Sequence, residues 1–168
     1  MPTSVLFVCY ANVCRSPLAE GVFRHFVGRR GLDGALTIDS AGTSAFVGSE
    51  PHPLSVSIAR QHGIELQGVS RQLVRDDLFE FDHIVVMDRA NERAVAKLEQ
   101  TAFAPGQRAS ATIRLLRQLS TPTARGSALD VPDPIAGGPS HYAYCYELIE
   151  RGCLALLDEL AETVDSAT

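Results

Sequence analysis

The chain has 168 residues, 45% of them hydrophobic, a length and apolar content typical of a single compact domain spanning residues 1–168. Its 15 basic and 20 acidic residues give a formal charge of -5, the wrong sign for a protein that wraps nucleic acid. No stretch approaches the about 18 uninterrupted apolar residues of a membrane span, and no charged leader precedes Val5, so we expect a cytoplasmic protein without membrane insertion.

Apolar runs alternate with helical periodicity through the first half of the chain. The continuous apolar run 5–9 predicts a strand that is buried on both faces and central in a parallel sheet. Apolar residues at helical spacing predict a helix over about 17–30, with Pro17 suited to its first turn. Residues 36–39 predict a second strand, and residues 54–62 predict another helix.

The second half of the chain continues this alternation. We expect a third strand over 82–87, a helix over about 89–98 and a fourth strand over 112–116. A loop rich in proline and glycine, 122–139, precedes a long closing helix over 142–160. Such alternation indicates right-handed βαβ units. The predicted fold class is α/β, a three-layer open parallel sheet of about four strands with helices on both faces.

One short segment combines a cysteine, an arginine and a helix start at the end of the first predicted strand. Ligands of open parallel sheets bind outside the carboxyl ends of the strands, where Cys9 stands. The residues between Cys9 and Pro17 can curl so that backbone N–H groups and the positive end of the helix surround a phosphate. Besides Arg15, the predicted phosphate-binding loop consists of Tyr10, Ala11, Asn12, Val13, Cys14 and Ser16.

Cys9 and Arg15 have the chemistry that such a loop needs. The planar fork of Arg15 can hold two phosphate oxygens at once and stays charged at any working pH. The same positive charge and the helix N-terminus favour the thiolate of Cys9 over its thiol. The residues alone therefore predict a nucleophilic cysteine that acts on a phosphate group and needs neither a metal nor another cofactor.

Further short motifs are spread along the chain. Together with the loop they are Cys9-x5-Arg15-Ser16-Pro17, Ser40-Ala-Gly-Thr43, Arg71-Gln72, Met87-Asp88 with Asn91, and Asp133-Pro134. In these features the chain resembles the low-molecular-weight protein tyrosine phosphatases over nearly its whole length. The resemblance implies a protein-tyrosine-phosphatase that hydrolyses phosphotyrosine in proteins, and aryl phosphates, with a tyrosine-phosphorylated protein as its partner.

The resemblance also implies a role for each catalytic residue. Cys9 would attack phosphorus to form a phosphocysteine intermediate, while Arg15 binds the equatorial oxygens. Asp133 would protonate the leaving phenolate and then activate water as general acid and base. From the residues alone the choice of aspartate stays open, because Asp-Pro is an ordinary turn signal and Asp130 lies three positions away.

The resemblance assigns supporting roles to three polar residues of this region. Ser16 would stabilise the departing thiolate, and Asn12 with Ser40 would brace the loop. Two positions in and around this brace depart from the family pattern. Ala11 replaces a glycine, which costs strain if the position needs a positive φ, and Gly68 replaces a histidine that joins the brace in some relatives.

The aromatic rim of the expected site is also reduced. Ile135 and Ala136 stand where many relatives carry aromatic residues beside the substrate ring. Tyr10 and Phe46 remain as the expected substrate rim, so we expect a wider or more selective pocket.

The four cysteines are expected to be free thiols, because no export signal is present. Two interpretations of Cys14 stay open: a plain loop thiol, or the redox partner that forms the family's reversible disulfide with Cys9. Cys145 and Cys153, eight residues apart in the last helix, are expected to pack in the core.

Two other functions are compatible with the loop. A thiol-dependent arsenate reductase would share fold and loop, but that class uses further cysteines in mid-chain, and no cysteine lies between Arg15 and Tyr144. A phosphotyrosine-binding module with weak turnover is the non-enzymatic alternative. Ala11 is its one supporting feature.

Overall fold

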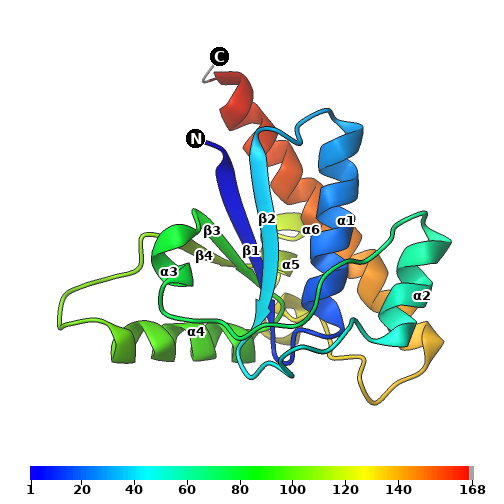
Figure 1. The fold of residues 1–168 in the computed structure, drawn as a ribbon, viewed down its shortest axis with the longest axis horizontal. Helices are drawn as coiled ribbons and strands as arrows, with labels where there is room; N and C mark the ends of the chain where they lie inside the picture. Colours follow the sequence, from blue (N-terminus) through cyan, green and yellow to red (C-terminus); the bar gives the residue numbers. More distant parts are fainter. Residues whose placement is uncertain (167–168) are drawn as a thin grey trace.

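The computed structural model describes residues 1–166, and its centre is a parallel sheet of four strands in the order β2-β1-β3-β4 (Figure 1). The strands are β1 (Thr3–Cys9), β2 (Leu36–Gly42), β3 (His83–Val86) and β4 (Thr112–Leu115). β1 pairs with β2 over its whole length and with β3 on its other side. The predicted α/β fold is confirmed, with the first strand in the interior of the sheet.

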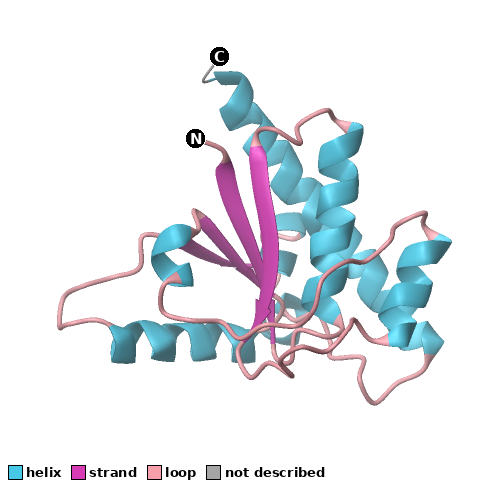
Figure 2. Ribbon diagram, viewed as in Figure 1, coloured by secondary structure: helices cyan, strands magenta, loops and turns pink. Residues whose placement is uncertain are grey.

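Helices cover both faces of this sheet (Figure 2). They are α1 (Arg15–Arg29), α2 (Pro53–Gln61), α3 (Asp77–Glu80), α4 (Arg89–Ala102), α5 (Leu116–Ser120), a 3-10 turn (Gly126–Leu129) and α6 (Pro139–Ser166). α1, α2, α5 and α6 pack on one face, and α3 and α4 pack on the other (Figure 1). Within residues 1–166, no helix has the length and apolar content to cross a membrane.

β1 contributes side chains to the cores on both faces. Val5, Phe7 and Cys9 belong to the core under α1 and α6, whereas Leu6 and Val8 belong to the core under α4. Each of the four apolar residues 5–8 is fully buried. This alternation explains why the strand is apolar at every position from Val5 to Cys9 rather than at every second one.

Several elements differ from those predicted; β2 and α4, for example, continue to Gly42 and Ala102, beyond their predicted ends. α1 begins at Arg15, two residues earlier than expected, so the arginine of the loop already belongs to the helix. The short helices α3 and α5 were not predicted, because four or five residues are too few to show helical periodicity. α6 begins at Pro139 and continues to Ser166, beyond both predicted ends.

Candidate active site

The carbonyl groups of the 9–16 loop, which leads from β1 into α1, bond outward to neighbouring segments. The segment after β2 donates backbone N–H groups to the carbonyls of Cys9, Tyr10 and Ala11 over 2.8–3.0 Å. Donors at and just before α2 reach the carbonyls of Val13 and Cys14, at 2.7 and 3.1 Å. Because C=O and N–H point in opposite directions across a trans peptide, these bonds turn the N–H groups toward the concave side of the loop. That side is suited to an anion.

Two backbone positions make this curl possible. Gly42, opposite Cys9 at the end of β2, has no room for a side chain, because a Cβ there would lie 2.6 Å from the carbonyl oxygen of Tyr10. Asn12 has a φ of 58° and is the one non-glycine residue with positive φ among residues 1–166. Ala11 does not have a positive φ. The Cβ of Ala11 therefore causes none of the strain that a positive φ would bring.

The side chain of Asn12 holds the loop from inside. Its Oδ1 accepts from the backbone N–H of Arg71 at 2.9 Å, and its Nδ2 donates to Ser40 Oγ at 3.0 Å and to Ser16 Oγ at 2.7 Å. Ser16 Oγ in turn lies 2.9 Å from Cys9 Sγ. All of these polar atoms lie in buried or partly buried residues, where hydrogen bonds fix positions tightly. The structure thus brings the predicted brace residues together behind the cysteine.

Arg15 is a buried arginine beside two carboxylates. Its Nη1 donates to Asp88 Oδ2 at 2.6 Å and to the carbonyl of Val131 at 2.9 Å. Its Nη2 lies 3.5 Å from Asp133 Oδ2, and the side chain is only 2% exposed. Burial by itself would lower the pKa of Arg15, but Cys9, Asp88 and Asp133 outweigh it, so the pKa is raised and the guanidinium stays charged.

Asp88 is a site residue that sequence reasoning did not assign. It caps the N-terminus of α4 in a capping box with Asn91 while its other oxygen holds Arg15. The available signal was its place directly after the predicted third strand, 82–87, at the same sheet edge as Cys9. The carboxylate of Asp88 orients the guanidinium of Arg15 by binding Nη1, so that Nη2 faces Asp133.

The two aspartates of the loop before α6 occupy different surroundings. Asp130 accepts the backbone N–H of Arg89 at 2.9 Å and pairs with its guanidinium, which holds the pKa of Asp130 below its usual value. Asp133 is 43% exposed on its side chain and faces Arg15. Only Asp133 of the pair lines the hollow that contains Cys9.

This hollow lies at the carboxyl end of β1 and has a volume of about 240 Å³. It is lined by Cys9, Tyr10, Ala11, Val13, Cys14, Arg15, Asp133 and Ile135. Of the two predicted rim residues, Tyr10 lines the hollow, whereas Phe46 is 74% exposed and does not. Ile135 also lines the hollow.

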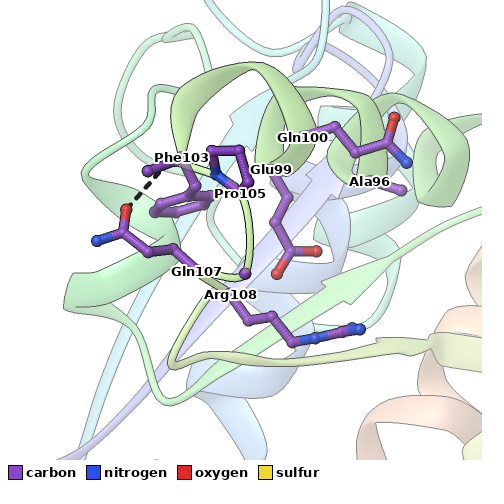
Figure 3. Close-up of a pocket in the computed structure, with 9 residues that line it drawn as sticks. Ala96, Glu99, Gln100, Phe103, Pro105, Gln107 and Arg108 are labelled. Carbon is purple, nitrogen blue, oxygen red and sulfur yellow. Dashed lines mark hydrogen bonds between the residues drawn. The ribbon is translucent and has the colours of Figure 1, made fainter.

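A second hollow, of about 500 Å³, lies at the C-terminal end of α4 (Figure 3). Glu99, Phe103 and Arg108 line it, and a hydrogen bond from the Ala104 N–H to Gln107 closes the turn beside it. It contains none of the predicted site residues. The hollow around Cys9 is therefore the candidate active site.

The other three thiols are buried and free. Cys14 Sγ lies 3.4 Å from the hydroxyl of Tyr142, and burial raises its pKa. Cys145 and Cys153 lie in the core, as expected. Among residues 1–166, no three metal-ligating side chains are grouped to hold an ion.

A parallel sheet with an anion-sized hollow at a helix N-terminus is typical of enzymes that bind phosphate groups. The family model described as "Low molecular weight phosphotyrosine protein phosphatase" matches residues 4–166. A low molecular weight protein-tyrosine-phosphatase of Streptomyces coelicolor is 37% identical over 166 residues, or 98% of each chain.

Solved structures agree with these sequence matches. The crystal structure of YfkJ from Bacillus subtilis superposes with a TM-score of 0.81 at 33% identity, covering 97% of each chain. The drosophila arginine phosphatase superposes with a TM-score of 0.83 at 28% identity, covering 93% of this chain and 96% of that one. The chain belongs to the low molecular weight phosphotyrosine protein phosphatase family. It is a hydrolase of the protein-tyrosine-phosphatase class, and this family acts on phosphorylated proteins.

Proposed function

We propose that the protein hydrolyses phosphotyrosine in proteins, and aryl phosphates, through a phosphocysteine intermediate on Cys9. The observation that supports this best is the single hollow that Cys9, Arg15 and Asp133 line together. A nucleophile, a fixed cation and a carboxyl group are the three groups that such a displacement uses. The proposal also agrees with the family to which the chain belongs.

In the first step the thiolate of Cys9 attacks phosphorus and the bond from phosphorus to the phenolic oxygen breaks. Protonated Asp133 donates its proton to the departing oxygen, so a neutral phenol leaves. Arg15 and the N–H groups of the 9–16 loop bind the equatorial oxygens, where negative charge is concentrated in the transition state. The phosphoryl group is then bound to sulfur.

In the second step water attacks the phosphocysteine. The carboxylate of Asp133 accepts a proton from the water, the bond from phosphorus to sulfur breaks and inorganic phosphate leaves. The electron pair returns to the sulfur of Cys9. Ser16, 2.9 Å away, stabilises that thiolate by donating its hydroxyl proton.

The walls of the hollow favour an aromatic leaving group. Tyr10, Val13 and Ile135 present mainly apolar surface, and within the described chain Asp133 is the one carboxylate that lines the hollow. Phosphoarginine is the second candidate substrate, because the drosophila structural neighbour is named an arginine phosphatase. Its guanidino leaving group carries several N–H donors, and apolar walls would leave them unpaired.

Thiol-dependent arsenate reduction has less support than ester hydrolysis. It needs further reactive thiols, and the thiols of Cys145 and Cys153 are buried and donate to backbone carbonyls at 3.1 and 3.7 Å. Burial raises the pKa of Cys145 to about 11, and it raises the pKa of Cys153 as well. Neither thiol is suited to pass oxidation onward, because thiolates are the reactive form.

The test is the Cys9→Ser variant, with Cys145→Ser as a matched thiol control outside the hollow. Cys9→Ser should retain less than about a thousandth of the aryl phosphatase activity, the scale on which loss of a nucleophile registers. Binding of inorganic phosphate, measured by calorimetry, should survive in Cys9→Ser. Cys145→Ser should remain active on aryl phosphates.

Wild-type turnover of peptides carrying phosphotyrosine, phosphoserine or phosphoarginine, and of arsenate, then identifies the substrate. We expect phosphotyrosine to be preferred. Larger residual activity in Cys9→Ser would place the nucleophile elsewhere. A preference for phosphoarginine or arsenate would overturn the substrate assignment while keeping the site.

A further inference from the structure

A continuous line of hydrogen bonds joins the side of α1 to the sulfur of Cys9. Ser40 Oγ donates to Glu20 Oε2 at 2.8 Å, and Asn12 Nδ2 donates to Ser40 Oγ at 3.0 Å. Asn12 Nδ2 also donates to Ser16 Oγ at 2.7 Å, and Ser16 Oγ lies 2.9 Å from Cys9 Sγ. Glu20 is the outermost member of this line, with 16% of its side chain exposed.

The orientation of the Asn12 amide is determined by a neighbour on the opposite side. The backbone N–H of Arg71, 2.9 Å away, can only donate, so the atom that faces it must be Oδ1. The NH₂ group of Asn12 therefore faces Ser40 and Ser16. Rotating the amide by half a turn would place two donors against each other at Arg71.

The hydroxyl protons then have one arrangement that satisfies every group. Ser40 already accepts a proton from Asn12, so its own proton needs another acceptor, and the carboxylate of Glu20 provides it. Ser16 likewise accepts from Asn12, which leaves its proton for Cys9 Sγ at 2.9 Å. The alternative acceptor for Ser16, the carbonyl of residue 41, is more distant at 3.4 Å.

Other charged groups near Ser40 already have partners. Asp39 borders the same small recess as Glu20, but its Oδ2 accepts from Arg71 Nε at 3.0 Å. Arg24, 52% exposed, reaches Glu20 from the solvent side and binds Oε1, the oxygen that Ser40 does not use. Glu20 is therefore the carboxylate that receives the proton of Ser40.

We infer that Glu20 is a positioning residue for the proposed reaction. By accepting the proton of Ser40 it holds the amide of Asn12 in place, and Asn12 keeps the hydroxyl proton of Ser16 directed at the sulfur of Cys9. Without Glu20 the buried hydroxyl of Ser40 loses its acceptor, and the bonds that depend on it weaken. This inference rests on the proposed role of Cys9 as nucleophile and adds a residue that does not touch the substrate.

The experiment compares Glu20→Ala with the conservative Glu20→Gln, which retains an oxygen that can accept from Ser40. Arg24→Ala is the matched control, because it removes the ion pair of Glu20 and leaves the bond to Ser40. Two quantities are measured for each variant: kcat on an aryl phosphate, and the pH dependence of Cys9 alkylation by iodoacetamide, quantified by mass spectrometry. The other titratable groups that line the hollow around Cys9 are unchanged in all of them: Tyr10, Cys14, Arg15 and Asp133.

We expect Glu20→Ala to lower kcat by roughly five- to tenfold, the effect of losing about one hydrogen bond. Its alkylation curve should move by roughly half a pH unit or more toward higher pH, because the thiolate loses a donor. Glu20→Gln and Arg24→Ala should stay close to wild type. Ser40→Ala should have the same effects as Glu20→Ala. The double variant should lose no more kcat than either single variant, because both changes break the same line of hydrogen bonds.

Three results would overturn the inference: an unmoved alkylation curve in Glu20→Ala, an equal effect of Arg24→Ala, or losses that multiply in the double variant. Failure of the proposed function gives a different result. It would appear as a wild type that does not hydrolyse aryl phosphates, or as an active Cys9→Ser. Alkylation needs no substrate, so it tests the role of Glu20 even in that case.

Discussion

Asp130 and Asp133 lie three positions apart, and their partners separate their roles. Asp130 is paired with Arg89 at the N-terminus of α4, which ties the loop before α6 to that helix. Asp133 has an exposed carboxyl group on the rim of the hollow that contains Cys9. A general acid must reach the leaving oxygen, and this geometry favours Asp133.

The leaving group distinguishes the two aspartates experimentally. We expect Asp133→Asn to lower kcat on phosphotyrosine by roughly a hundredfold or more, the lower end of general acid catalysis, and to spare much of the rate on an aryl phosphate whose phenolate leaves unaided. The high-pH limb of the kcat profile should disappear on phosphotyrosine. Asp130→Asn should do neither. Equal losses on both substrates would indicate damaged binding, and the reverse ranking would assign the acid to Asp130.

Cys14 lines the same hollow as Cys9, and we propose that it is the redox partner of Cys9. Burial raises its pKa, so near neutral pH it is a thiol, held 3.4 Å from the hydroxyl of Tyr142. Peroxide would convert the Cys9 thiolate to a sulfenic acid and release hydroxide. The thiol of Cys14 would then attack that sulfur, and a disulfide would form with loss of water.

We expect mild peroxide to inactivate the wild type reversibly, with activity restored by a dithiol reductant. Cys14→Ser should recover much less, because its sulfenic acid has no thiol to trap it and proceeds to irreversible products. Cys145→Ser, which alters a thiol outside the hollow, serves as the control. The proposed disulfide is wrong if Cys14→Ser recovers as completely as the wild type.

At the scale of elements, β2 determines the shape of the 9–16 loop as much as the loop's own residues do. The last residue of β2, Gly42, lies against the backbone of Tyr10 and Asn12. The residues that follow β2 donate N–H groups to the loop carbonyls. The end of β2 and the residues after it therefore fix the backbone conformation of the 9–16 loop from its outer side.

Gly42→Ala should distort the 9–16 loop, because the added Cβ would lie 2.6 Å from the carbonyl oxygen of Tyr10. This oxygen belongs to the backbone, which cannot move away as a flexible side chain would. We expect a loss of about 1–3 kcal/mol in the free energy of unfolding, typical of overpacking, together with a large loss of kcat. Denaturant unfolding and aryl phosphatase assays measure these quantities. Gly34→Ala is the matched control, since no atom lies within 4 Å of a Cβ there and its φ is not positive. Unchanged activity in Gly42→Ala would contradict the role of β2 in fixing the conformation of the 9–16 loop.

At the scale of the whole molecule, the strands and long helices were predictable because their signals are local. The apolar run of β1 and the periodicity of α1 and α6 depend on residues close together in the chain. The loop from Cys9 to Ser16 was predictable for the same reason. Its cysteine, arginine and helix start lie in one segment.

The remaining parts depend on contacts between distant segments. Asp88 meets Arg15 across 73 positions, and Ser40 meets Glu20 across 20. The place of Asp88 after a strand indicates the sheet edge on which it lies but not its partner, and Glu20 has no local feature that distinguishes it from a surface residue. The path of the long loop after β2 is likewise determined by its backbone bonds to the distant 9–16 loop, so the contacts of the exposed Phe46 side chain could not be predicted from the local sequence, and its rim role stays a prediction.

The membership of β1 in both cores has a consequence for how the enzyme loses activity. Its residues alternate between the two faces, and the strand ends at Cys9. A region that opens locally must have few buried contacts of its own, and this strand has buried contacts on each side. We therefore expect the backbone amides of this strand, which ends at the nucleophile, to exchange slowly. Heat inactivation should accompany cooperative unfolding of the whole sheet rather than fraying at the active site.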